Sequence, residues 1–125
     1  MGYFIFMLIM DLLIPAMLLG FGAYFKKRAP KEINHLFGYR TRRSMQNEKT
    51  WAYAHKILGK LWWRFGFLSL TLCLPLFFFI KKGVAAIGTV GTILCLVQFV
   101  PIFLSIILVE RALKKKFDEN GNEKE

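Results

Sequence analysis

The sequence predicts an all-α membrane protein with three transmembrane helices, the second of which is extended on the cytoplasmic side by an amphipathic helix. Hydrophobic residues make up 55% of the 125 residues, yet the formal net charge is +10. Apolar and basic residues must therefore be segregated along the chain. The apolar residues gather in three runs, and a hydrocarbon core needs roughly 20 apolar residues in a helix. An amphipathic pattern precedes the second run and gives the extension.

The first span is predicted at about residues 2–25, a run broken only by Asp11 and Pro15. It has no basic segment before it and is longer than the core of a signal peptide, so we expect it to be retained. A charged group is costly within a span, so Asp11 is expected to face a polar interior, to pair with another group or to be protonated. Asp11, Pro15, Leu18 and Gly22 share one stripe, which predicts the side that faces the other helices.

The second and third spans are predicted at about residues 63–80 and 84–109, separated by two lysines and a glycine. So short a connection predicts an antiparallel helical hairpin. In the third span a small or polar residue recurs every seven positions, and we expect Gln98 among these to be a candidate partner of Asp11. Small residues on the first span offer a surface for close helix packing and leave homo-oligomerisation open; they are Ala16, Gly20 and Ala23.

Lysine and arginine are distributed unevenly between the connections. Eleven of the 18 lie between residues 26 and 64, two lie in the second connection and five follow residue 110. The positive-inside rule therefore predicts a multi-pass membrane protein with its N-terminus outside and its C-terminus in the cytoplasm. A single three-helix domain is expected over residues 1–117, in which residues 26–62 form a cytoplasmic loop and helix. The polar segment 118–125 is predicted to be a disordered tail.

The amphipathic helix is predicted to start near Ser44. Apolar or aromatic residues follow at spacings of 4, 3 and 4, while basic residues occupy the opposite side. One continuous helix from Ser44 to Ile80 would be about 55 Å long, so its beginning must stand outside the hydrocarbon. Thr41 and Ser44 are candidate N-caps, with Asn47 as the reciprocal partner. The apolar side is expected to meet lipid or protein, and it carries Trp51, His55, Leu58 and Trp62.

The segment before this helix contains residue types that suit a defined turn. Gly38 suits a backbone angle that other residues rarely adopt. Arg40 carries a planar donor fork that could bind a phosphate, a carboxylate or helix carbonyls, with Asn34, Thr41 and Asn47 holding it. A purely structural role, in which Arg40 ties the loop to the helices, is the alternative.

The segment resembles the recurring motif of a bacterial membrane protein family, the SdpI family. The matching residues, which we take as candidates for ligand or partner binding, are Asn34, Gly38, Tyr39, Arg40, Thr41, Ser44, Asn47, Trp51, His55 and Gly59. The resemblance implies an SdpI-like immunity factor of the bacterial plasma membrane that protects the cell against a membrane-active peptide toxin by binding. The chain is shorter than SdpI, which has more spans.

Two other functions stay open from the residues themselves. The first is a membrane-anchored sensor that recruits a cytoplasmic regulatory protein or anionic lipid through its basic loop. In that case the lipid headgroups would be bound by Arg42, Arg43, Lys56 and Lys60. The second is a small transporter or pore subunit that uses the intramembrane polar residues Asp11 and Gln98.

Several kinds of chemistry are not expected. Basic residues that flank a span usually determine topology, so no nucleic-acid binding is predicted. The sequence has no nucleophile beside a base and no phosphate-binding glycine loop, so we expect no enzyme and no cofactor. His35 and His55 lie twenty residues apart without other ligands at suitable spacing, so no metal site is predicted. Cys73 and Cys95 are interpreted as small apolar residues that do not form a bridge.

Overall fold

Three helical segments long and apolar enough to cross a membrane make up the protein in the computed structural model, which describes residues 2–28, 33 and 38–124. The first is α1 (Gly2–Lys27); the second consists of α2 (Glu48–Leu72) and the 3-10 helix η1 (Leu74–Phe79). The third consists of α3 (Val84–Val97) and α4 (Phe99–Lys116). The predicted class, all-α with three spanning helices, is confirmed.

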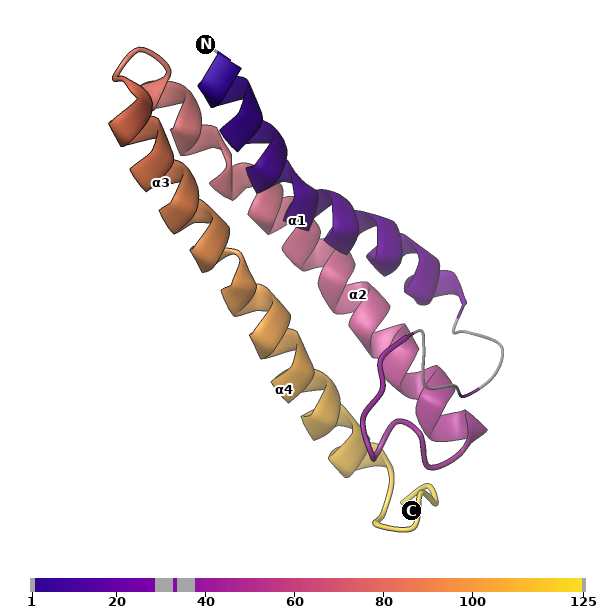
Figure 1. Ribbon diagram of the computed structural model, residues 1–125. Coiled ribbons are helices and arrows are strands. Elements are labelled where there is room, and N and C mark those ends of the chain that lie inside the picture. The colour runs from indigo at the N-terminus through magenta and orange to yellow at the C-terminus, as the bar shows by residue number, and fades with distance from the viewer. Residues whose placement is uncertain (1, 29–32, 34–37, 125) are drawn as a thin grey trace.

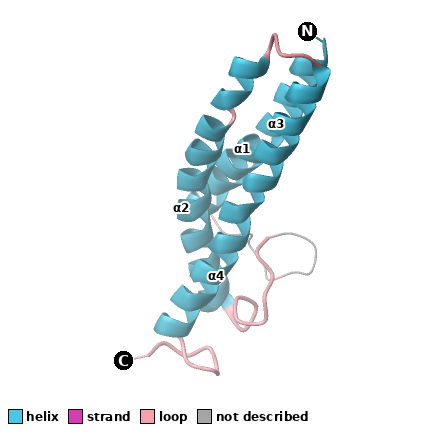
Figure 2. Ribbon diagram, turned by 90° about the vertical axis from the view of Figure 1, so that its left-hand side faces the viewer, coloured by secondary structure: helices cyan, strands magenta, loops and turns pink. Residues whose placement is uncertain are grey.

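The helices form an elongated antiparallel bundle (Figure 1). Helix α1 packs along α2, while α3 packs against α1 and α4 packs against α2. One end of the bundle, here called the hairpin end, holds the start of α1 and the turn between η1 and α3. The other end, here called the motif end, holds the start of α2, the end of α4 and the C-terminal segment (Figure 2). The bundle therefore brings residues 38–47, here called the motif loop, beside the end of the chain.

Glycines bring the backbones of α1 and α2 close together. A Cβ added at Gly22 would lie 2.7 Å from the backbone nitrogen of Trp63, and one at Gly59 would lie 2.6 Å from the carbonyl carbon of Phe25. A Cβ at Gly66 would lie 2.7 Å from the side chain of Leu19. Side chains at these positions would push the helices apart, which is the usual reason for small residues at helix crossings in lipid.

The side of α1 that faces the bundle is the predicted one. Asp11, Pro15, Leu18 and Gly22 are all buried. The small-residue surface predicted for close packing is different: Ala16 and Gly20 are exposed, and a Cβ at Gly20 would meet no atom within 4 Å. Within the chain, Gly22 of the neighbouring stripe makes the close approach instead, and packing of the small-residue surface against a second copy stays a prediction.

Prolines interrupt both later spans, which corrects the prediction of one continuous helix from Ser44 to Ile80. Pro75 has no N–H for the carbonyl of Thr71, so α2 ends at Leu72 and the chain continues as a 3-10 helix. In the same way Pro101 has no N–H for the carbonyl of Val97, where α3 ends. The third span also continues beyond residue 109, because α4 runs to Lys116.

The C-terminal segment is ordered through residue 124, contrary to the prediction of a disordered tail. The N–H of Asp118 donates to the carbonyl of Asn122 at 2.8 Å, and the N–H of Lys124 donates to the carbonyl of Lys116 at 2.9 Å. The turn also accepts hydrogen bonds from the motif loop, since Gln46 donates to the carbonyl of Glu119 at 2.6 Å. Long-range partners, which composition does not reveal, order this polar segment.

Candidate functional site

Tyr39 connects the loop at the motif end to two helices. Its N–H donates to Nε2 of His55 on α2 at 2.8 Å, and its hydroxyl donates to Oε1 of Glu110 on α4 at 2.7 Å. Burial, followed by the hydrogen bond to the Glu110 carboxylate, raises the pKa of the Tyr39 phenol above its usual range. The phenol therefore stays protonated and keeps donating, so the loop is attached to α2 and α4 at once.

His55 is fully buried and uses both ring nitrogens. Because the N–H of Tyr39 can only donate, Nε2 must accept, and the proton must lie on Nδ1, 2.8 Å from the carbonyl of Trp51. The ring also contacts Phe25 of α1 edge-on, with centroids 5.0 Å apart. The neutral imidazole thus lies where the loop, α1 and α2 meet.

Ser44 and Thr41 form a reciprocal turn rather than the start of the helix. The N–H of Thr41 donates to Oγ of Ser44 at 2.9 Å, and the N–H of Ser44 donates to Oγ1 of Thr41 at 3.2 Å. The Ser44 hydroxyl also donates to the carbonyl of Tyr39 at 2.9 Å. The prediction that Thr41 or Ser44 caps the helix is therefore wrong, because both hydroxyls are used to close this turn.

Asn47 is the N-cap of α2, and its partner is Thr50. The N–H of Thr50 donates to Oδ1 of Asn47, and the N–H of Asn47 donates to Oγ1 of Thr50, both at 3.0 Å. This is a capping box with Thr in place of the usual Glu or Gln. The Asn47 amide also donates to the carbonyl of Gly121 at 2.8 Å, which ties the cap to the C-terminal turn.

Gly38 and Gly59 have backbone reasons for being glycine. Gly38 has a φ of 109°, so the predicted turn with an unusual backbone angle is present immediately before Tyr39. Gly59 lies at the crossing with α1 described above. Of the motif residues, Asn34 lies outside the described part of the chain, as does His35.

The tryptophans of α2 pack against protein. Trp51 is 2% exposed, and its ring centroid lies 4.3 Å from that of His55. Trp62 is half-buried and donates its indole N–H to Oγ of Ser105 on α4 at 3.0 Å. The apolar side of α2 therefore meets the other helices. Of the two contacts predicted for this side, with lipid or with protein, the structure has the contact with protein.

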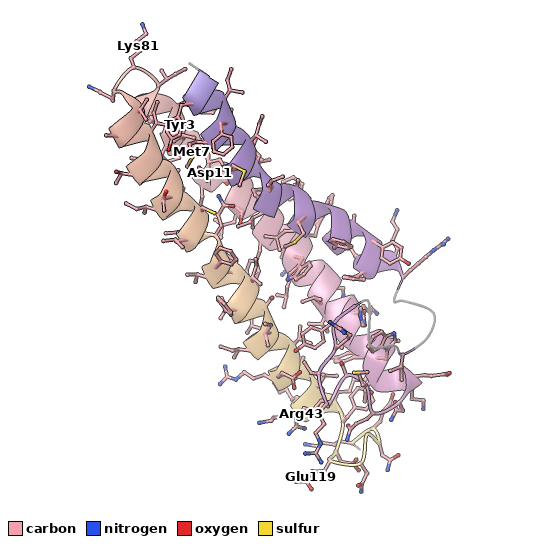
Figure 3. All side chains as sticks on the ribbon, viewed as in Figure 1. Tyr3, Met7, Asp11, Arg43, Lys81 and Glu119 are labelled. Carbon is pink, nitrogen blue, oxygen red and sulfur yellow. The ribbon has the colours of Figure 1, made fainter. Side chains whose placement is uncertain are left out.

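The arginines of the loop differ in their environments. Arg40 is exposed and makes no hydrogen bond or ion pair with the described residues, and Thr41 and Asn47 bond elsewhere instead of holding it. Arg43 faces Glu110 across 3.7 Å from Nε to Oε2, whereas Arg42 is exposed. Figure 3 shows Arg43 directed toward the C-terminal turn that carries Glu119. Lys56 and Lys60 are exposed on the outer side of α2, where a role in lipid binding stays a prediction.

An open apolar groove of about 370 Å³ begins at this loop. It runs between α1 and α4 over α2, and Arg40 lies on its wall at the motif end. The other lining residues are Met17, Phe21, Phe25, Gly38, Tyr39, Thr41, Leu58, Trp62, Ile102 and Ile106. The motif loop thus closes one end of a groove whose length is formed by the spans.

Several polar side chains lie inside the bundle around Asp11. Asp11, Ser69 and Gln98 are fully buried, and within the described ranges neither carboxylate oxygen of Asp11, nor Oγ of Ser69, nor Oε1 of Gln98 has a hydrogen-bond partner. Figure 3 shows Asp11 with Tyr3 and Met7 on the side of α1 toward α3. No hydrogen bond joins Asp11 to Gln98, its predicted partner; the Gln98 amide donates instead to Sγ of Cys73 at 3.4 Å.

Cys73 has a polar role that the interpretation as a small apolar residue missed. Pro15 cannot donate to the carbonyl of Asp11, four residues earlier in α1. The Cys73 thiol donates to that carbonyl at 3.3 Å. Cys73 and Cys95 are both free, as predicted. The thiol therefore compensates, across the helix interface, for the hydrogen bond that Pro15 removes.

Sequence reasoning named most of the loop residues but not their partners. Glu110 and Thr50 were missed, and the hydrogen bonds of Cys73 were not expected. An acidic residue between an apolar span and a run of lysines could have singled out Glu110. In the part of the chain that the structure describes, no three His, Cys, Asp or Glu side chains lie together as a metal site would require.

The comparisons with known proteins give one match. The sequence model of the SdpI/YfhL protein family matches residues 31–109. The matched range includes the motif loop, α2, η1, α3 and α4 as far as Val109, and it leaves α1 outside. No curated protein and no solved structure matches the chain.

Proposed function

The chain belongs to the SdpI/YfhL family, and on this premise we propose that it is a membrane immunity factor that protects the cell against a membrane-active peptide toxin. The observation that carries the proposal is the match over residues 31–109, which contains the whole motif loop. The mechanism is binding and not catalysis. The protein binds either the toxin or the membrane site that the toxin attacks.

The geometry of the motif end supports binding. Tyr39, His55 and Glu110 hold the loop in one conformation, so a partner meets a preformed surface and loses less conformational entropy on binding. That surface presents Arg40, which is exposed and makes no hydrogen bond or ion pair with the described residues. Because basic residues gather at this end, the positive-inside rule favours the cytoplasmic side of the membrane for this surface.

A protection assay tests the proposal. A bacterial strain sensitive to membrane-active peptides is given the gene, and growth is measured across a panel of such peptides. Protection against at least one peptide is expected, with the Arg40→Gln variant weaker than the wild type. Arg42→Gln serves as the matched control, because Arg42 is an exposed arginine of the same loop that does not line the groove. Unchanged sensitivity to the entire panel would refute the immunity role.

A further inference from the structure

We propose that the groove between α1 and α4 is a binding site for an anionic phospholipid, with an acyl chain along its apolar wall and the phosphate at Arg40. This site goes beyond the immunity role and does not depend on it. Three properties of the groove lead to the proposal: the composition of its walls, the direction from which it can be entered, and the charge at its end.

The walls of the groove are almost entirely apolar. Met17 and Phe21 line it from α1, and Ile102 and Ile106 line it from α4. Its volume of about 370 Å³ falls within the range of roughly 300–1,000 Å³ that is usual for small-molecule sites. An extended peptide would leave its backbone amides without hydrogen-bond partners against such walls, whereas an acyl chain has no polar groups to satisfy.

The groove opens toward the bilayer. The residues that form its length belong to helices long and apolar enough to span the membrane, and Ile106 is itself exposed. A ligand therefore enters sideways from the hydrocarbon, and in a bilayer the molecules available on that side are lipids. This position favours an occupant that is apolar along most of its length.

The charge at the motif end selects the headgroup. Arg40 lines the groove, is exposed and has no hydrogen bond or ion pair with any described residue. The nearby carboxylate of Glu110 is already bonded to Tyr39 and faces Arg43, so it does not neutralise Arg40. A guanidinium matches the oxygens of a phosphate with two parallel hydrogen bonds. With a formal net charge of +10, the chain further favours a lipid of negative overall charge.

Native mass spectrometry of the purified, delipidated protein tests the site. Phosphatidylglycerol and a diacylglycerol with identical acyl chains, which lacks the phosphate, are titrated separately, and the apparent Kd of the first bound lipid is compared. The wild type is expected to bind phosphatidylglycerol about tenfold more tightly, the ratio that one charge-assisted hydrogen-bonded pair supports. Arg40→Gln should lose this preference, whereas Arg42→Gln should keep most of it.

A second pair of variants tests the groove itself. Ile106→Trp fills the groove and should weaken binding of both lipids, whereas Ile107→Trp, at the neighbouring exposed position outside the groove, should not. Circular dichroism checks that each variant keeps the helix content of the wild type, and only folded variants are compared.

Three results would overturn the proposal. Equal affinity of the wild type for the two lipids would remove the headgroup site at Arg40. Equal losses in Arg40→Gln and Arg42→Gln, or in Ile106→Trp and Ile107→Trp, would show diffuse attraction to the protein surface. A lipid-free dimer that Ile106→Trp dissociates would assign the groove to a second copy of the chain.

Discussion

Replacement of His55 by Ala should release the motif loop from the bundle. The N–H of Tyr39 would be left buried without its acceptor, which costs about 1–3 kcal/mol. The ring contacts with Phe25 and Trp51 would also be lost, at about 0.5–1.5 kcal/mol for each pair. We expect the free energy of unfolding to fall by about 2–6 kcal/mol from these terms together. The cavity left by the buried ring adds to this loss.

The size of the loss can be separated into its parts with a second variant. His55→Gln keeps an acceptor for the N–H of Tyr39 but removes the aromatic ring, so it should be less destabilising than His55→Ala. Lys56→Ala is the matched control, because Lys56 is the next residue of α2 and is exposed.

Two measurements check this prediction in detergent micelles. Unfolding by sodium dodecyl sulfate, followed by circular dichroism, reports global stability. Amide hydrogen exchange of residues 38–46 reports whether the loop opens locally, and protection of Tyr39 should fall most. If His55→Ala changed neither quantity more than Lys56→Ala does, the reasoning that His55 holds the loop would be refuted.

Three further predictions concern the helix interfaces, and the same unfolding titration measures each. Gly59→Leu should destabilise the bundle by about 1–3 kcal/mol because its Cβ meets the backbone of α1, whereas Gly20→Leu should change stability by less than about 0.5 kcal/mol; equal effects would contradict the close crossing at Gly59. Asp11→Leu should stabilise the protein by about 1–3 kcal/mol because neither carboxylate oxygen has a described hydrogen-bond partner, and a loss of stability would instead reveal a bound water, ion or other partner. Cys73→Ala should lower the free energy of unfolding by about 1 kcal/mol. The loss should be smaller in a Pro15→Ala background, where the new backbone N–H of residue 15 can donate to the carbonyl of Asp11. Additive effects in this double-mutant cycle would argue against the compensating thiol.

The three spans, their order and the buried stripe of α1 could be predicted from the sequence. Span length and the 3.6-residue period depend only on local composition, so Asp11, Pro15, Leu18 and Gly22 were assigned to the correct side. The helix breaks at Leu72 and Val97 could also have been predicted from the local sequence, because Pro75 and Pro101 follow them closely. A prediction from span hydropathy alone does not take these prolines into account.

The candidate site was predicted in part. The turn predicted at Gly38 is present, and the motif residues follow from the resemblance to the SdpI family. The helix cap was shifted to Asn47, because Thr41 and Ser44 bond each other and several small polar residues compete for one cap. The order of the C-terminal turn could not be predicted, since its partners Gln46 and Asn47 lie more than 70 residues away.

The sequence by itself determined that this is a three-span membrane protein and which segment carries the family motif, because hydropathy and spacing are properties of neighbouring residues. Only the tertiary structure decided what the motif residues do. It joins Tyr39 to His55 and Glu110, leaves Arg40 without a partner among the described residues, and places that arginine at the end of an apolar groove. Hydrogen bonds and grooves of this kind form between helices, so their geometry depends on packing that no single segment encodes.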